Sequence, residues 1–377
     1  MFREFNSAIL RGDDAAISQA LQGSLGEIEA EVLLRCIKEA SVPTALVGGW
    51  LRDLVLNKAS GDVDLICGDP DQLARKLQEL GASKAVLLDA VRRTWRVIFA
   101  NGSYIDISAP RGEGPDLLLA DLELRDLRVN AMAWSPCLGF IDPLCGLDDL
   151  RDGVLRAASA TALTDDPLRA LRCWRLAIQL NLGLSSELKA DLQGLVVDEV
   201  AGERTASELQ QILLHPGAPI AVEGLAEAGI LQQLLPGAKR LALFRSCMQR
   251  SYDSPALQRC LAAVCDEGDS WIVGLRLGWL LQAPRLKKEL LTRRWSRRSA
   301  RLASIGSSQV ERAGENKPST EQIDSELRRW KDASSVAILC RVAQLGSEEA
   351  EVLAARYLEV LGDRAMGGAL THSKARE

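Results

Sequence analysis

Two adjacent glycines between an apolar strand and a helix place the strongest constraint on how this chain can fold. Residues 45–53 read Ala-Leu-Val-Gly-Gly-Trp-Leu-Arg-Asp, which predicts a short buried strand, a turn at Gly48 and Gly49, and the start of a helix. Glycine lacks a Cβ, so its backbone N–H can face an anion, and a helix start adds its positive dipole end. Arg52 is placed to add a charged donor. The stretch therefore predicts a phosphate-binding turn.

A pair of acidic residues follows at the start of a second apolar strand. Asp62 and Asp64 flank Val63, and side chains two residues apart in a strand share one face. Two neighbouring carboxylates repel each other unless a cation lies between them, and Mg²⁺ suits such a pair and bridges it to phosphates. Either feature alone is common in turns or strand edges. Together they predict a site for a metal ion and a nucleotide.

These two stretches resemble the first motif of a known family. The sequences at residues 48–53 and 62–64 are similar to those of the class II tRNA nucleotidyltransferases and bacterial poly(A) polymerases, within the polymerase-β-like nucleotidyltransferase superfamily. The resemblance implies Mg²⁺-dependent transfer of a nucleotide from ATP or CTP to an RNA 3′ end. It further implies that the glycine turn and Arg52 hold the triphosphate and that Asp62 and Asp64 bind the metal.

A third acidic residue lies in a predicted strand further along the chain. Strand-like runs occupy residues 85–89, 95–100 and 104–108, and Asn101-Gly102 predicts a hairpin between the last two. Asp106 stands between two Ile residues, where a carboxylate is unfavourable unless it faces solvent, a cation or a donor. The resemblance implies that Asp106 completes the metal site. A solvent-facing strand position is the alternative.

Residues 122–134 resemble the second motif of the family, whose usual form is Arg-Arg-Asp-Phe-Thr-Ile-Asn-Ala-Met-Ala. Arg125, Asp126 and Asn130 match it, whereas Arg128 stands in place of Thr. The match implies that the three matching residues contact the ribose or the triphosphate. A sugar hydroxyl needs such donor and acceptor groups to be recognised.

Residues 165–172 resemble the fourth motif, Glu-Asp-x-x-Arg. A single helix is predicted here, with Thr164 as its cap and the side chains of Asp166, Arg169 and Arg172 near one face. In the family, the Asp and Arg of this motif read the Watson–Crick edge of the incoming base in place of a nucleic-acid template. Asp165 replaces the family's Glu. An amphipathic helix with a surface ion pair is the alternative.

Two further motifs predict architecture rather than chemistry. Residues 139–150 resemble the third motif and contain an Asp-Pro turn, which indicates a structural hinge between sheet and helices. Residues 203–208, Glu-Arg-Thr-Ala-Ser-Glu, resemble the fifth motif. Their acids are expected to brace the helix that carries the base-reading residues.

Length and composition indicate a largely helical protein of several units. The chain has 377 residues with 47% hydrophobic and only 4% aromatic residues, and its pattern is helical from about residue 170 onward. We therefore predict an α+β fold: a nucleotidyltransferase head with a small mixed sheet (residues 1–158), a helical neck that recognises the base (159–225), and a helical body and tail that bind RNA (226–377).

One basic run stands out in a chain of net charge −5. Residues 285–301 contain eight Lys or Arg, which predicts contact with RNA phosphates, although a solvated helix face is the alternative. The polar stretch at residues 307–321 is predicted to be a linker. The expected RNA contacts are Lys287, Lys288, Arg293, Arg294, Arg297 and Arg298.

Several classes of protein are excluded by what the sequence lacks. The nine Cys form no CxxC pair, which argues against a zinc or disulfide scaffold, and two His are too few for a His-rich hydrolytic metal site. No signal peptide or membrane span is recognisable, so a cytoplasmic location is expected. No obligate protein partner is inferred.

Three functions fit these motifs. The leading one is maturation of the tRNA 3′ end by addition of CCA, CC alone or A alone. The link from Ile107 to the second motif is short, and in the family this segment includes a flexible loop that helps the switch from C to A addition. A CC-adding specialist and an A-adding specialist therefore both stay open. The alternatives are a poly(A) polymerase and, in another class, a catalytically inactive RNA-binding protein.

Overall fold

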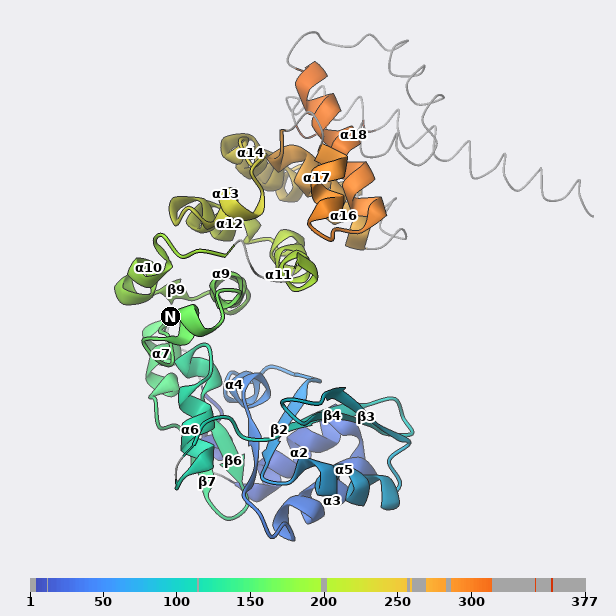
Figure 1. Ribbon diagram of the computed structural model, residues 1–377, viewed down its shortest axis with the longest axis vertical. Helices are drawn as coiled ribbons and strands as arrows, with labels where there is room; N and C mark the ends of the chain where they lie inside the picture. The colour runs from blue at the N-terminus through green and yellow to red at the C-terminus, as the bar shows by residue number, and fades with distance from the viewer. Residues whose placement is uncertain are drawn as a thin grey trace, which may run out of the picture. The chain divides into compact units, whose positions relative to one another are not determined.

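The computed structural model describes two compact units of the chain (Figure 1). One comprises residues 1–169 with 181–192, and the other residues 170–180 with 193–377. Within them the structure describes residues 5–11, 13–113, 115–197, 202–255, 258–259, 269–282 and 286–313, together with Ala343 and Ala354. The predicted boundaries at residues 158 and 225 stay predictions. None of the described helices is long and apolar enough to cross a bilayer.

A seven-stranded mixed sheet forms the centre of the first unit, in the order β3-β4-β5-β2-β1-β6-β7. Strands β2 and β5 are parallel, whereas the other neighbours are antiparallel. This sheet, together with the helices around it, confirms the predicted α+β class. The strands are β1 (Thr44–Val47), β2 (Val63–Cys67), β3 (Lys84–Asp89), β4 (Thr94–Ile98), β5 (Tyr104–Ser108), β6 (Ala133–Ser135) and β7 (Gly139–Ile141).

Short helices surround this sheet, and a second, two-stranded parallel sheet pairs β8 with β9. Local sequence accounts for several helix starts. The Asp69 side chain accepts a hydrogen bond from the Gln72 N–H at 3.3 Å and Pro70 opens α5. The remaining elements are α1 (Ser7–Leu10), α2 (Asp14–Leu25), α3 (Glu27–Lys38), α4 (Gly49–Val55), α5 (Pro70–Glu79), α6 (Leu117–Glu123), a 3₁₀-helix (Arg128–Asn130), α7 (Gly146–Asp152), β8 (Val154–Leu155), α8 (Ala162–Asp165), β9 (Gly183–Leu184) and α10 (Ser186–Leu192).

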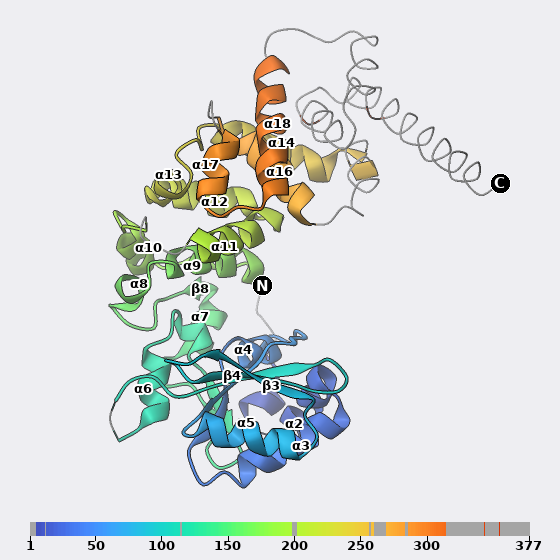
Figure 2. The same cartoon turned by 45° about the vertical axis from the view of Figure 1, so that its right-hand side comes forward.

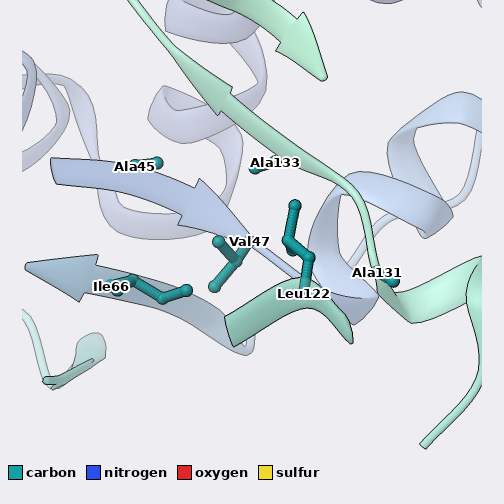
Figure 3. Packing of buried hydrophobic residues seen from close by; sticks show 6 residues of the cluster. All are labelled: Ala45, Val47, Ile66, Leu122, Ala131 and Ala133. Atoms are coloured by element: carbon teal, nitrogen blue, oxygen red, sulfur yellow. The ribbon is translucent and has the colours of Figure 1, made fainter. Parts of the chain in front are cut away.

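One face of the large sheet is covered by apolar side chains over only half of its width. On β1, Val47 packs with Ala133 of β6 and with Leu122 of α6, and Ala45 packs with Ile66 of β2 (Figure 3). These side chains are buried and hold α6 against the strands β1, β6 and β7. Burial of this kind contributes about 25 cal/mol per Å² of apolar surface.

The other half of the same face carries charge. The strand register places Arg96 of β4 opposite Asp106 of β5, Asp106 beside Asp64 of β2, and Asp64 opposite Val47 of β1. Residues paired in this way lie on one face of a sheet. Arg96, Asp106 and Asp64 are half-buried, unlike the apolar cluster beside them. The sheet therefore presents a charged row next to an apolar, helix-covered region.

The regular elements described in the second unit are helices, as predicted, and Ala238 and Leu281 form an isolated β-bridge between them. In both views α17 and α18 lie side by side (Figures 1 and 2), and α18 also packs against α16. A Cβ on Gly278 of α16 would lie 3.0 Å from the Cα of Gly306 in α18, so the two backbones approach closely. The helices are α9 (Arg169–Leu180), α11 (Gly202–Leu214), α12 (Ala218–Glu227), α13 (Ile230–Leu234), α14 (Leu241–Asp253), α16 (Asp269–Leu280), α17 (Leu286–Thr292) and α18 (Arg297–Ala313).

One of the two acids of the fifth motif, Glu208, braces α9. Glu208 of α11 accepts a hydrogen bond from Nε of Arg175 at 2.6 Å, and both side chains are largely buried. A Cβ on Gly224 of α12 would lie 2.0 Å from the Trp174 ring, so α12 also packs tightly on α9. Helix α9 is therefore held on two sides within this unit.

Two predictions about secondary structure are wrong. The single helix expected around residues 165–172 is two helices, because Asp166 is extended (φ −146°, ψ 95°) between α8 and α9. The predicted linker begins inside α18, since residues 307–313 are helical. Ser307 is buried there and donates to the Leu281 carbonyl at 2.8 Å. Residues 314–321 of that linker and most of the predicted tail lie outside the described residues.

Candidate functional site

The turn at Gly48 lies next to the guanidinium of Arg125 and the carboxylate of Asp64. Gly48 has φ 83° and ψ −143°, a conformation that side-chain-bearing residues rarely adopt, and its N–H donates to the Met132 carbonyl at 3.1 Å. A Cβ on Gly48 would lie 2.7 Å from Nη1 of Arg125 and 3.7 Å from Oδ2 of Asp64. The absence of a side chain at Gly48 therefore lets the turn approach residues from two of the predicted motifs.

The predicted metal ligands lie close together in the strand order. Asp64 and Asp106 are register partners on the parallel strands β2 and β5, and Asp62 directly precedes β2. Val63 and Leu65 are buried on the opposite face, which leaves Asp62 exposed and Asp64 half-buried. The alternation expected from the sequence is therefore present, although Asp62 is outside the strand itself.

Asp106 is paired with a cation from the chain itself. Nε and Nη2 of Arg96 donate to Oδ1 and Oδ2 of Asp106, each at 2.8 Å, in a bidentate ion pair. This pair holds the pKa of Arg96 above its ordinary value. Within the described part of the chain, no three His, Cys, Asp or Glu side chains are grouped to hold a metal ion. Asp62 and Asp64 fit a hard cation by their chemistry, and Asp106 faces Arg96.

Tyr104 links Arg96 to Asp62. Its ring centroid lies 4.1 Å from Cζ of Arg96, and its hydroxyl donates to Oδ1 of Asp62 at 2.7 Å. The hydrogen bond to the Asp62 carboxylate raises the pKa of Tyr104 above its ordinary value, and partial burial adds to the shift. Four side chains, Asp62, Tyr104, Arg96 and Asp106, thus form one connected polar network on the charged half of the sheet.

A second network ties the glycine turn to the second motif. Nε and Nη2 of Arg52 both donate to the Asp53 carboxylate at 2.9 Å, and Nη1 donates to Oδ1 of Asn130. The Asn130 amide in turn donates to Oδ1 of Asp126 at 3.0 Å. Arg52, Asn130 and Asp126 are all buried. The predicted nucleotide-binding residues are therefore brought together, with Asp53 as a member that the sequence did not suggest.

Arg125 is held in place by a buried acid. Asp121 is 3% exposed and forms ion pairs with Arg125 at 3.1 Å and with Arg111 at 2.9 Å. Burial alone would raise the pKa of Asp121, but the charge of Arg125 and the hydrogen bonds and charge of Arg111 outweigh it, and the pKa lies below its ordinary value. Asp121 therefore keeps its charge and orients Arg125 toward the turn.

We expect Asp121→Asn to destabilise the chain by about 2 kcal/mol, less than the loss of a fully buried partner because Arg111 is partly exposed. Urea unfolding at neutral pH measures this. Because the pKa of Asp121 is lower in the folded than in the unfolded chain, the ionised carboxylate stabilises the folded chain at pH values above the unfolded-state pKa. The difference in free energy of unfolding between wild type and variant should therefore shrink as the pH falls below about 4. Asp116→Asn, an exposed cap of the same helix, is the control. A pH-independent difference would contradict this assignment.

The fourth motif lies partly in the first unit, where Arg169 is bound to the backbone. Its guanidinium donates to the carbonyls of Leu124 at 2.8 Å, Ala162 at 3.0 Å and Arg125 at 3.2 Å. Arg169 thus fixes the chain beside the second motif. Asp165 accepts from the Thr161 hydroxyl at 2.9 Å and Asp166 from the Leu168 N–H at 3.2 Å. Arg172 of α9 is half-buried. No shared helix face unites these four side chains.

The predicted RNA contacts lie on and between α17 and α18 of the second unit. Lys287 and Lys288 are exposed on α17, and Arg294 is exposed in the turn between the helices. Arg297 and Arg298 are exposed at the start of α18, whereas Arg293 is half-buried. Arg285 lies outside the described residues. The exposed Lys and Arg side chains among these residues are thus available for contact with a chain of phosphates.

A separate polar pocket of about 670 Å³ lies in the first unit. Arg128, Arg156, Ser159 and Glu187 help to line it, and none of the predicted site residues does. Arg156 is paired with the buried Asp149. The pocket mixes both charge signs and indicates no single class of ligand.

The sequence did not single out Asp53, Arg96, Tyr104 or Asp121. A faint signal existed for Arg96 and Tyr104, which alternate with apolar residues in predicted strands and so share the face of Asp106. Asp121 stands four residues before Arg125, a spacing that pairs side chains on a helix.

The family of poly A polymerase head domains matches residues 44–156, and a family described as a probable RNA and SrmB-binding site of polymerase A matches residues 195–241. The chain is 34% identical to an A-adding tRNA nucleotidyltransferase of Deinococcus radiodurans, with 51% of this chain and 45% of the relative aligned. It is 35% identical to a CC-adding tRNA nucleotidyltransferase of Geobacter sulfurreducens, with 49% and 43% aligned. The chain thus spans less than half the length of these relatives.

Solved structures share the fold. The Thermotoga maritima CCA-adding enzyme complexed with tRNA aligns with a TM-score of 0.70 and 21% identity, over 91% of this chain and 84% of that one. A CCA-adding enzyme in complex with CTP aligns with a TM-score of 0.72 and 22% identity, with the same coverage.

Proposed function

We propose that this chain, which resembles the class II CCA-adding tRNA nucleotidyltransferases and bacterial poly(A) polymerases, extends the 3′ end of tRNA. The reaction takes a nucleotide from CTP or ATP, releases pyrophosphate and needs no nucleic-acid template. The proposal is supported chiefly by the position of Asp64 and Arg125, whose side chains both lie next to the backbone of Gly48. A donor, a carboxylate and an uncovered backbone are what a metal-bound triphosphate needs.

The carboxylates Asp62 and Asp64 would hold Mg²⁺ at this turn. Bound there, Mg²⁺ supplies Lewis-acid stabilisation of the phosphoryl oxygens and lowers the pKa of the RNA 3′-hydroxyl. If Asp106 is a third ligand, as predicted, metal binding competes with the ion pair between Asp106 and Arg96.

The two guanidinium groups near the turn have different tasks in this proposal. Arg125 lies against Gly48 and would bind the triphosphate, with Asp121 fixing its direction. Arg52 donates one hydrogen bond from each of its three side-chain nitrogens, to Asp53 and to Asn130, and would chiefly stiffen the turn. These bonds use three of the five N–H groups of a guanidinium. We propose its two remaining N–H groups as donors to a phosphate.

Selection of the incoming base is proposed for Asp166 and Arg169, with Asp165 and Arg172 as further residues of the same motif. A carboxylate and a guanidinium together offer the acceptors and donors that distinguish C and A from other bases. In this structure Arg169 binds the Leu124 and Arg125 carbonyls, so base reading would use its remaining N–H groups or a rearranged side chain.

We further propose that the chain adds C residues and stops before A. The link from β5 to α6 runs only from residue 109 to residue 116, in the segment where the family carries the loop that helps the switch to A addition. Relatives named CC-adding tRNA nucleotidyltransferase are among those that the chain resembles. A cytoplasmic location fits a partner such as tRNA.

A direct assay tests the function. Purified protein with Mg²⁺ receives tRNA transcripts that end at the discriminator base, at C or at CC, with CTP and ATP separately and together. The proposal expects two C residues on the bare end and no A on any transcript. Full CCA or a single A on the CC end would support the family function and overturn CC specificity. Long A tracts on unrelated RNA would identify a poly(A) polymerase, and no incorporation would leave an RNA-binding protein.

The basic run of the second unit should bind tRNA through phosphates. We expect Lys287→Ala/Lys288→Ala to weaken tRNA binding without sequence preference and to reduce the slope of log affinity against log salt by about 2, roughly 1 for each lysine. Filter binding at several salt concentrations measures both quantities. The control is Lys58→Ala/Lys84→Ala, which removes two exposed lysines from the first unit. An unchanged slope would show that α17 does not face the RNA.

A further inference from the structure

A helix that carries none of the family motifs is bonded to the segment of the first motif. Helix α2 buries one apolar face and packs against α3. Hydrogen bonds join its last turn to three other parts of the first unit: the start of α4, the link between α4 and β2, and the turn between β4 and β5. These parts adjoin Arg52, Asp62 and Tyr104, so the end of α2 holds the surroundings of the candidate site in place.

The hydroxyl of Ser24 joins two of these parts. Its oxygen accepts the indole N–H of Trp50 at 3.0 Å and lies 2.8 Å from the Ser60 carbonyl oxygen, to which the hydroxyl donates. A hydroxyl has one hydrogen and two lone pairs, so it can make both bonds at once. The Ala20 carbonyl of the same helix is the more distant acceptor, at 3.1 Å. Trp50 is 1% exposed, so loss of the Ser24 oxygen would leave a buried N–H without its acceptor.

Trp50 fixes the helix that follows the glycine turn. It is the second residue of α4, which begins at Gly49, and Arg52 lies two residues further on. At the other end of α4, the Val55 carbonyl accepts the Asn6 N–H at 3.0 Å. The segment before β1 thus holds α4 at both ends, and the bond from Trp50 acts at the end that the proposed function assigns to the triphosphate.

Ser60 belongs to the link of residues 56–62, which leads from α4 to β2 and ends at Asp62. Most of this link is exposed. In its first half the Lys58 N–H donates to the Asp53 carbonyl at 2.8 Å, and in its second half Ser24 holds the Ser60 carbonyl. Two residues span at most about 7 Å, so the bond to Ser60 limits how far Asp62 can move.

The end of α2 reaches Asp62 by a second route. The Leu25 carbonyl is one of the last in the helix, where no helical N–H follows to bond it. It accepts the side-chain amide of Asn101, and the Ser103 hydroxyl lies 2.9 Å from it. The next residue, Tyr104, donates to Asp62 at 2.7 Å. Asp62 is therefore held through its own link and through the neighbouring strand β5, and α2 is bonded to both.

We propose that Ser24 is a positioning residue of the nucleotide-transfer site, which ties the helix after the glycine turn to the link that carries Asp62. The inference rests on the proposed function, in which the turn binds the triphosphate and Asp62 binds the metal ion. Ser24 itself touches neither ligand. Groups that orient a metal ligand from behind typically change metal affinity or activity by about 10- to 100-fold when they are removed.

The test measures Mn²⁺ binding to the full chain without nucleotide, by electron paramagnetic resonance of the unbound ion. Ser24→Ala should weaken Mn²⁺ binding about 10-fold, because Asp62 loses the bond that fixes its link. Ser24→Thr keeps the hydroxyl and should stay within about 2-fold of wild type. In a chain that already carries Asp62→Asn, Ser24→Ala should cause no further loss, since its effect passes through Asp62.

Trp50→Phe tests the contact with α4 separately. It removes the indole N–H, keeps an aromatic ring and leaves the bond between Ser24 and Ser60 in place. In the tRNA assay, Trp50→Phe and Ser24→Ala should each raise the KM for CTP by about 10-fold, because α4 is no longer fixed beside the glycine turn. Mn²⁺ binding without nucleotide should change less than about 2-fold in Trp50→Phe, since the link to Asp62 keeps its anchor.

Two variants of the same helix are the controls. Ser18→Ala removes a half-buried hydroxyl that, within the described residues, bonds to neither Trp50 nor Ser60, and both measurements should stay at the wild-type level. Ile17→Val removes one buried methylene and should lower the free energy of unfolding without changing the site. Circular dichroism and urea unfolding establish that each variant is folded before binding is compared.

Three results would overturn the proposal: wild-type Mn²⁺ affinity in a folded Ser24→Ala variant, an equal loss of affinity in Ile17→Val, or a further loss when Ser24→Ala is added to Asp62→Asn. If Ser24→Ala does not fold, Trp50→Phe decides, and an unchanged KM for CTP in that variant overturns the proposal.

The Mn²⁺ measurement needs no turnover, so its outcome is separate from that of the tRNA assay. The expected Mn²⁺ pattern without any nucleotide addition would reject the proposed function alone. Nucleotide addition that Ser24→Ala leaves at the wild-type rate when Mn²⁺ is limiting would reject this inference alone.

Discussion

Asp64→Asn should abolish nucleotide addition to tRNA, with a loss of at least about 1000-fold in rate. The amide keeps the shape of the side chain but removes the negative charge beside Gly48 that a divalent cation needs. Metal coordination supplies several kcal/mol of transition-state stabilisation, and each 1.4 kcal/mol or so is tenfold in rate. Single-turnover incorporation of labelled CTP measures the loss.

The fold should survive this change, since the amide keeps the size of the side chain and Asp64 is not a member of the buried apolar cluster. Asp148→Asn is the matched control, because Asp148 is 59% exposed and forms a surface pair with Arg151. Such pairs contribute about 0–1 kcal/mol, so activity should stay at the wild-type level. More than a tenth of the wild-type rate in Asp64→Asn would show that the chemistry does not depend on this carboxylate.

Gly48→Ala should lower the rate by about 100-fold, because the new methyl group would lie 2.7 Å from Nη1 of Arg125 and force that guanidinium away from the turn. The backbone conformation at Gly48 adds a strain of about 1–3 kcal/mol for any residue with a side chain. Steady-state kinetics with varied CTP and urea unfolding together measure both consequences. A rise in KM for CTP should accompany the loss of rate.

Gly102→Ala is the control that separates the steric clash with Arg125 from the backbone strain of a positive φ. Gly102 has φ 85°, close to the 83° of Gly48, but no atom lies within 4 Å of its would-be Cβ. This variant should lose stability and keep its activity per folded molecule. An equal loss of activity in both variants would assign the effect to backbone strain and remove the close approach of Arg125 from the argument.

The stretch that carries these predictions was readable from the sequence because its signals are local. The strand, the turn at Gly48 and the helix after it need only neighbouring residues, and the face shared by Asp62 and Asp64 follows from strand alternation. What the sequence could not supply was the partner of each charge. Arg96 meets Asp106 only through the register of β4 and β5.

The helix around Asp166 was mispredicted for a different physical reason. The spacing of residues 165–172 suits a helix, but the Asp166 carboxylate accepts the Leu168 N–H and so competes with helical bonding. The reverse error occurred at residues 307–313, whose polar composition suggested a linker. Tertiary packing of Ser307 and Val310, both buried, overrides that composition.

The parallel contact between β2 and β5 has a consequence for the order in which the chain folds. The strands β3, β4 and β5 form a local meander that needs only short hairpins, whereas Asp64 meets Asp106 only after the whole segment between β2 and β5 has closed into a loop. The charged row is thus assembled in a late, non-local step. An ion that binds this row recognises only the folded chain and stabilises it by mass action, so the chemistry of the site also acts as a check on completed folding.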